Sequence, residues 1–227
     1  MATELTWLGH GCWLIETGEY TILLDPFLDN SPTAAQVHGR RPHGDPDFAR
    51  PLRPHRRGCL DRPALAGAVV ISNFEVSEWV AAQGHEKVVG MNIGGQIIQP
   101  FGTVKMTQAL HSSSLPDGAY GGNPAGFIVS LDDGTIYFAC DTGLFLDMQL
   151  IGTAGIDLAV LPIGDLFTMG PDDAVEATKL IMPKRVAPAH YNTFPPIEQD
   201  AEAWAKKIRK QTDAEPIVVT PGGKITL

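Results

Sequence analysis

The sequence predicts an α/β sandwich, with sheets inside and helices outside, from two observations. The first half is a succession of short apolar segments separated by glycine-containing turns, whereas the second half alternates strands with helices. The 227 residues are 44% hydrophobic and 19% charged, a composition that can bury one full core. We therefore expect residues 1–227 to form a single domain.

The first half is expected to consist mainly of strands. Apolar and polar residues alternate with a period of two near the N-terminus, which is typical of half-buried antiparallel strands. The elements expected here are strands at 5–7, 12–14 and 20–24, a short buried strand at 69–72, a helix at 74–83, and further short strands between 87 and 110.

The second half changes character. Asp132-Asp133-Gly134 predicts the turn of a hairpin. Pro171 followed by Asp172 and Asp173 predicts a helix start, because proline fits the first helical position and acids favour the N-terminal end of the helix dipole. The expected elements are a hairpin over 127–139, a strand at 156–163, a helix at 171–181, a strand at 185–189, an amphipathic helix at 197–211 and a last core strand at 217–219.

Charge and cysteine content exclude several classes of protein. The formal net charge of −9 disfavours nucleic acid and anionic membrane surfaces as partners. The three cysteines, Cys12, Cys59 and Cys140, are odd in number and widely spaced, so we expect no disulfide framework and a cytoplasmic location. Nowhere do eighteen apolar residues follow one another, so no membrane span is expected. A homo-oligomer is left open.

Residues 36–66 differ from the rest of the chain. This segment holds seven of the nine arginines and five prolines, carries a local charge of +4 and has neither helical nor strand periodicity. We expect it to be an aberrant Arg/Pro-rich stretch within the domain that packs poorly. It lacks the interleaved aromatic residues of a nucleic-acid-binding arm.

Side chains that bind metal ions recur directly after apolar strands. Neighbouring strands that run in the same direction end at a common edge of their sheet, so such residues converge although they are far apart in the sequence. Imidazole and carboxylate groups together suit Zn²⁺ or Mn²⁺. The candidates are Asp25, His111, Asp141, Asp165 and His190.

Longer motifs surround these candidates: Leu8-Gly9-His10-Gly11, Leu24-Asp25-Pro26-Phe27, Gly90-Met91-Asn92-Ile93-Gly94-Gly95, Ala109-Leu110-His111-Ser112-Ser113, Asp141-Thr142, Leu161-Pro162-Ile163-Gly164-Asp165, Phe167-Thr168-Met169-Gly170-Pro171 and His190-Tyr191-Asn192-Thr193-Phe194-Pro195-Pro196. Together they resemble the metallo-β-lactamase superfamily, in its branch of small metal-dependent hydrolases of unassigned substrate related to ascorbate-6-phosphate lactonase. The resemblance covers nearly the whole chain outside residues 36–66. It implies an αββα four-layer sandwich with a site for one or two metal ions.

The resemblance also implies roles for individual residues. His111 would ligate a first metal, Asp141 would bridge two metals, and His190 would ligate the second. Asp25 and Asp165 would support the ligands from behind, with Asp25 orienting an imidazole. His10 would face the substrate, so that Asp141 and His10 are the expected catalytic residues.

The family's principal signature, H-x-H-x-D-H after the third strand, is absent, and the segment 36–66 stands in its place. Read one base further on, codons that encode residues 48–55 can spell Ser-His-Gly-His-Phe-Asp-His. We therefore hypothesise two compensating frameshifts, in the gene or in its sequencing. The alternative is natural divergence, with His43, Asp45, Asp47 or His55 near the site by chance.

The expected function is metal-dependent hydrolysis of a small ester, lactone or phosphoester, impaired in this chain because the signature is missing. Zn²⁺ or Mn²⁺ would be the cofactor, and we expect weak occupancy, because three ligands shared by two metals are fewer than catalytic zinc usually has. Cys140 could also reach a metal, although a small cysteine filling a strand is the simpler interpretation. The alternative function is a metal-poor binding or structural protein on the same fold.

Overall fold

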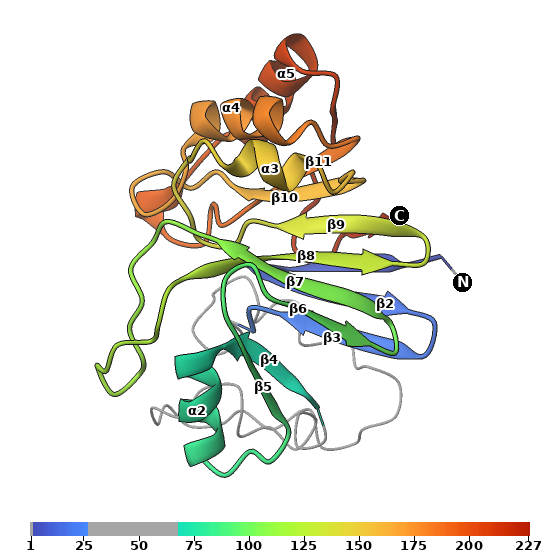
Figure 1. The fold of residues 1–227 in the computed structure, drawn as a ribbon. Helices are drawn as coiled ribbons and strands as arrows, with labels where there is room; N and C mark the ends of the chain where they lie inside the picture. Colours follow the sequence, from blue (N-terminus) through green and yellow to red (C-terminus); the bar gives the residue numbers. More distant parts are fainter. Residues whose placement is uncertain (1, 27–67) are drawn as a thin grey trace.

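The computed structural model describes residues 2–26 and 68–227, and it shows two sheets facing each other (Figure 1). Within these residues, one sheet has four strands in the order β13-β1-β2-β3, and the other has seven in the order β12-β11-β10-β9-β8-β7-β6. The segment 36–66, with His43, Asp45, Asp47 and His55, lies outside the described residues.

The four-stranded sheet forms because its apolar residues alternate. Leu5, Trp7, Trp13 and Ile15 are almost completely buried and pack in one core with residues of the other sheet, including Phe138. Burial of such a face is the main driving force for packing two sheets together. The strands of this sheet are β1 (Glu4–Gly9), β2 (Cys12–Thr17), β3 (Tyr20–Leu24) and β13 (Lys224–Thr226).

The seven-stranded sheet places four strand ends on one edge. β9, β10 and β11 are parallel, and β7 runs in the same direction because both β7 and β9 are antiparallel to β8. Their carboxyl ends lie on the left-hand side of Figure 1. The strands are β6 (Gln96–Gln99), β7 (Gly102–Gln108), β8 (Ala125–Leu131), β9 (Gly134–Phe138), β10 (Leu158–Pro162), β11 (Arg185–Ala189) and β12 (Glu215–Pro216).

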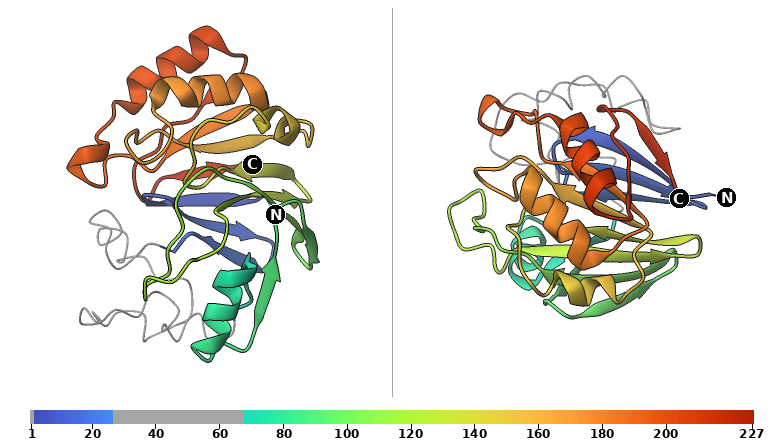
Figure 2. Two further views of the ribbon diagram at one scale, coloured as in Figure 1. Left: turned by 60° about the vertical axis from the view of Figure 1, so that its left-hand side comes forward. Right: turned by 90° about the horizontal axis from the view of Figure 1, so that it is seen from above.

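Helices cover the outside of this sandwich. α4 (Pro171–Ile181) and α5 (Ala201–Gln211) lie on the outer side of the seven-stranded sheet, next to the short α3 (Met148–Gly152) (Figure 2). α2 (Phe74–Ala82) packs on a separate pair of parallel strands, β4 (Val70–Asn73) and β5 (Val88–Met91). None of the helices in the described part of the chain is long and apolar enough to cross a membrane.

Most of the predicted elements are confirmed, including the α/β sandwich; three differ, and one helix was not predicted. The strand at 69–72 is β4, which is half-buried rather than buried, because it belongs to the small outer sheet. The helix expected from Ile197 begins at Ala201, where Asp200 caps the helix by accepting from Ala203 N–H at 2.9 Å. Residues 217–219 form no strand, because the chain leaves the sheet after Pro216 and returns as β13 beside β1. The short helix α3 was not predicted.

Candidate functional site

The turn between β1 and β2 carries His10 onto the end of β11 in the opposite sheet. The His10 carbonyl oxygen accepts hydrogen bonds from Trp7 Nε1, at 2.9 Å, and from the backbone N–H of His190, at 3.0 Å. The two imidazole rings have centroids 4.0 Å apart. One backbone hydrogen bond therefore joins the two histidines across the sandwich.

A hydrogen bond orients the His10 ring. Its Nδ1 lies 3.0 Å from Thr193 Oγ1, and this hydroxyl donates to the carbonyl oxygen of Tyr191 at 3.4 Å. Burial, and then the neighbouring His190, lower the pKa of His10 to about 4 despite the opposing effect of Asp141. His10 is an uncharged imidazole at neutral pH.

Asp141 and His190 form the centre of the site. His190 Nε2 lies 3.5 Å from Asp141 Oδ2, and only 6% of the His190 side chain is exposed. Asp141 Oδ1 and His190 Nδ1 are buried and have no hydrogen-bond partner among the described residues. Such unpaired buried polar atoms are costly, by about 1–3 kcal/mol each, unless another group satisfies them.

Asp25 adds a second carboxyl group next to Asp141. The residue as a whole is exposed, but its carboxyl is turned toward Gly11, where a Cβ would lie 2.5 Å from Asp25 Oδ2. Burial, and then the negative charge of Asp141, raise the pKa of Asp25 to about 6. Burial and these two carboxylates also raise the pKa of the Cys140 thiol, so Cys140 is protonated at neutral pH and a poor nucleophile.

Backbone strain concentrates at the same place. Eight non-glycine residues of the described part have a positive φ, and five of them are residues of this region. Left-handed conformations of non-glycine residues cost about 1–3 kcal/mol each and persist where the surrounding structure imposes them, often at functional sites. The five are His10, Asp25, Cys140, Asp165 and His190.

Among the described residues, neither His111 nor Asp165 completes a ligand group with Asp141 and His190. His111 is exposed after β7, and its Nδ1 lies 2.8 Å from the Ser112 carbonyl oxygen. Asp165 is exposed too, and its Oδ1 accepts from Leu166 N–H at 2.8 Å within its own turn. Both roles remain predictions.

Two residues that the sequence did not single out shape the site. Thr193 orients His10, and Gly164 lies so close to His190 that a Cβ there would collide with the His190 carbonyl oxygen. Both belong to motifs that were recognised as a whole. The motifs therefore contained both residues, but nothing in the neighbouring sequence indicated what either residue does in the site.

The pair fits part of a metal site. Two donors on one tetrahedral zinc ion lie about 3.4 Å apart when each bond is about 2.1 Å long, close to the observed 3.5 Å. The imidazole and carboxylate donors are of the right type, and each residue has an unsatisfied buried atom. Within residues 2–26 and 68–227, no third His, Cys, Asp or Glu completes a ligand group.

The raised pKa of Asp25 predicts a pH-dependent stability in chelator-treated protein. The folded state holds the Asp25 proton up to about pH 6, against an ordinary pKa of 3.8, so ionisation destabilises the fold as the pH rises through this range. Asp25→Asn is therefore expected to raise the melting temperature at pH 7.5 and to leave it unchanged at pH 3.5. A lower melting temperature of the variant at pH 7.5 would contradict the assignment.

Comparisons with known proteins identify the family of the chain. Residues 4–190 match the family model described as the beta-lactamase superfamily domain. A UPF0173 metal-dependent hydrolase of Thermus thermophilus is 47% identical over 210 residues, which cover 92% of each chain. A UPF0173 metal-dependent hydrolase of Methanopyrus kandleri is 38% identical and covers 96% of this chain and 97% of its own.

Solved structures show the same fold. Igni18, a novel metallo hydrolase from Ignicoccus hospitalis, superposes with a TM-score of 0.77 at 27% identity, covering 100% of this chain and 99% of its own. An isothiocyanate hydrolase from Delia radicum gut bacteria has a TM-score of 0.66 at 16% identity, covers 99% and 98% of the two chains, and is similar in fold alone. The chain therefore belongs to the metallo-β-lactamase superfamily, among the UPF0173 metal-dependent hydrolases.

Proposed function

We propose that this chain is a metal-dependent hydrolase of a small ester, lactone or phosphoester, with an activity limited by the missing H-x-H-x-D-H signature. Zn²⁺ or Mn²⁺ is the proposed cofactor. The observation that supports this most directly is the Asp141–His190 pair, whose donors are spaced as on one metal ion and whose remaining polar atoms are buried without partners among the described residues.

Each residue of the pair and its surroundings has a proposed role. Asp141 and His190 hold the metal, which when bound supplies a water of lowered pKa and polarises the scissile group. His10, uncharged and held through Thr193, faces the substrate. Asp25 places negative charge behind Asp141 and so favours a cation at the site.

A metal-poor binding protein on the same fold is the second candidate. The absence of the signature from the sequence favours it, as does the incomplete ligand group in the described part of the chain. Metal binding separates the two candidates, because a metal that binds only the folded state raises the melting temperature by mass action.

Asp141→Asn tests the proposal, with Asp147→Asn as the matched control on an exposed residue before α3. We expect millimolar zinc to raise the melting temperature of the parent chain and of the control but not of Asp141→Asn, because the amide removes the charged ligand. Hydrolysis of p-nitrophenyl acetate is expected to be low in the parent and undetectable in Asp141→Asn. An equal zinc-dependent shift in all three proteins would contradict the site.

A further inference from the structure

A groove lies next to the loop that follows Asp141. It has a volume of about 460 Å³, which is within the range of small-molecule sites. Three segments surround it: the connection between β5 and β6, the end of β7 and the approach to β8. Its described lining includes the apolar Ile93, Leu110 and Pro124 and the polar Gln108, His111 and Asn123.

Hydrogen bonds join this groove to the loop that carries Asp141. Leu110 N–H donates to Thr142 Oγ1 at 2.8 Å, and Gly143 N–H donates to the Leu110 carbonyl oxygen at 3.0 Å. The groove wall and the residues that follow Asp141 therefore form one unit. A substrate whose reacting group lies at Asp141 has the groove within reach of its remaining atoms.

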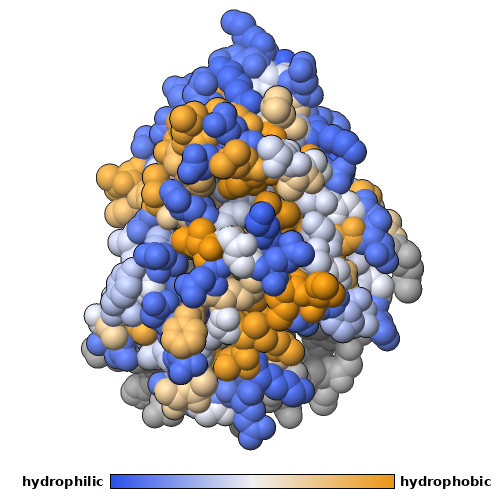
Figure 3. Space-filling view, viewed as in Figure 1, coloured by the Kyte–Doolittle hydropathy of each residue, from blue (hydrophilic) through white to orange (hydrophobic). Residues whose placement is uncertain are grey.

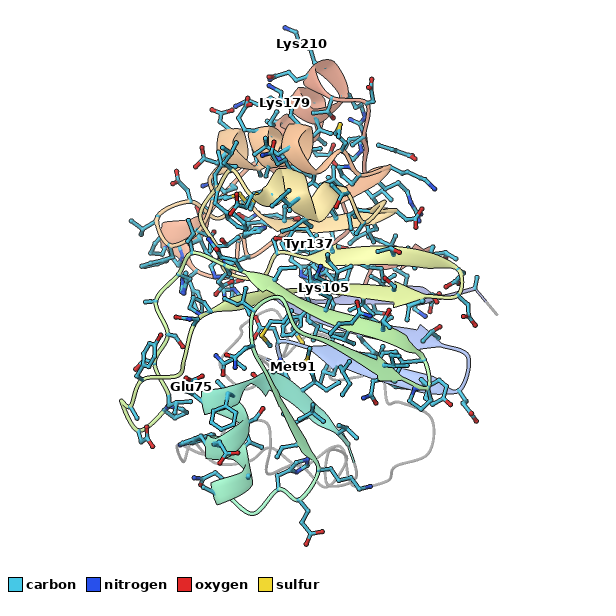
Figure 4. The ribbon with its side chains drawn as sticks, in the orientation of Figure 1. Glu75, Met91, Lys105, Tyr137, Lys179 and Lys210 are labelled. Atoms are coloured by element: carbon cyan, nitrogen blue, oxygen red, sulfur yellow. The ribbon has the colours of Figure 1, made fainter. Side chains whose placement is uncertain are left out.

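The far wall of the groove is held in place by α2. Asn73, the N-cap of this helix, donates through Nδ2 to the carbonyl oxygens of Gly121, at 2.7 Å, and Asn123, at 3.0 Å. Tyr120 OH donates to Asn123 Oδ1 at 2.9 Å. Figure 4 shows Glu75 at this end of α2, beside the long loop between β7 and β8. A wall that is ordered before binding lowers the entropic cost of taking up a ligand.

The lining chemistry selects an uncharged occupant. Ile93 and Leu110 are 41% and 47% exposed, so both present apolar surface in the groove. Among the described residues that line the groove there is no Lys, Arg, Asp or Glu. A phosphate group is normally held by Arg or Lys or by a helix N-terminus. Lys179 and Lys210, by contrast, project from the outer helices at the other end of the molecule (Figure 4).

We propose that this groove binds the uncharged alkyl or aryl part of the substrate, through Ile93 and Leu110, with the side-chain amides of Gln108 and Asn123 as hydrogen-bond partners. This rests on the proposed hydrolase function and narrows it: an ester or lactone with an apolar acyl group is the substrate class.

Ile93→Trp tests the groove directly, with Ile98→Trp as the matched control. Ile98 is 79% exposed on β6 and does not line the groove, and Figure 3 shows hydrophobic side chains around β6 on the outer face. The probes are hexanamide and hexyl phosphate, with binding followed by ligand-observed NMR. We expect hexanamide to bind the parent and Ile98→Trp equally, and Ile93→Trp at least about tenfold more weakly, the effect of losing burial for two methylene groups.

Two results of this binding measurement would contradict the proposed role of the groove. One is tighter binding of hexyl phosphate than of hexanamide, and the other is equal binding of hexanamide to Ile93→Trp and to the parent.

Measurements of ester hydrolysis then test the role of the groove and the proposed function separately. We expect Ile93→Trp to lower kcat/KM for p-nitrophenyl hexanoate about tenfold, and Ile98→Trp to leave it at the parent's value. If ester hydrolysis depends on Asp141 but not on Ile93, the proposed role of the groove is wrong and the proposed hydrolase function stands. If hexanamide binds as expected but no version of the chain hydrolyses esters, the proposed hydrolase function is wrong and the binding role of the groove stands.

Discussion

Restoring the alternative reading frame between codons 36 and 66 is expected to convert weak metal binding into stoichiometric binding. The shifted frame can spell the H-x-H-x-D-H signature, which would add histidine and carboxylate ligands to a site that already contains Asp141 and His190. Catalytic zinc usually has three protein ligands, and the described residues supply a pair. Metal content by mass spectrometry, melting with and without chelator, and ester hydrolysis should all increase together.

The matched control is a version with the restored frame in which the signature's histidines are replaced by glutamine. It should behave like the chain as written, because the segment then has its family-like sequence but not its ligands. Stoichiometric metal and equal activity in the chain as written would contradict the hypothesis. His43, Asp45, Asp47, His55 or Cys140 would then have to supply ligands.

Gly164→Ala is expected to destabilise the protein and to abolish zinc binding. A Cβ at this position would overlap the carbonyl oxygen of His190, and its Nδ1 would be only 3.1 Å away. Both neighbours belong to a buried residue at a strand end and cannot move aside cheaply. We expect a loss of about 2–4 kcal/mol, roughly 5–15 °C in melting temperature for a domain of this size.

Gly143→Ala is the control for this prediction. Gly143 lies two residues after Asp141 in the same region, but the nearest atom to an added Cβ is 3.9 Å away. The control should keep the parent's melting temperature within about 0.5 kcal/mol and keep its response to zinc. If the two variants were equally stable and bound zinc equally, the close packing of Gly164 on His190 would not be a requirement of the site.

An element could be predicted well where the residues that start or end it lie within the element itself. The helix at Pro171–Ile181 was predicted with its exact bounds, because Pro171 and the acids after it mark the first turn. The helix predicted from Ile197 begins four residues later, because Pro195–Ile197 forms a 3₁₀ turn and Asp200 is the cap. In this segment the apolar pattern used for the prediction began at Ile197, before the first residue of the α-helix, Ala201.

The sequence by itself determined most of the strands and helices, the family, and the position of Asp141 and His190 after strand ends. Only the tertiary structure decided which of these side chains meet. It brings the His10 ring to 4.0 Å, centroid to centroid, from that of His190, 180 positions away in the chain, and it places His111 in the lining of a groove. The reason is that hydrophobic periodicity specifies which face of an element is buried. The contacts across two sheets depend on how the whole core packs, and on close approaches such as that of Gly164 to His190.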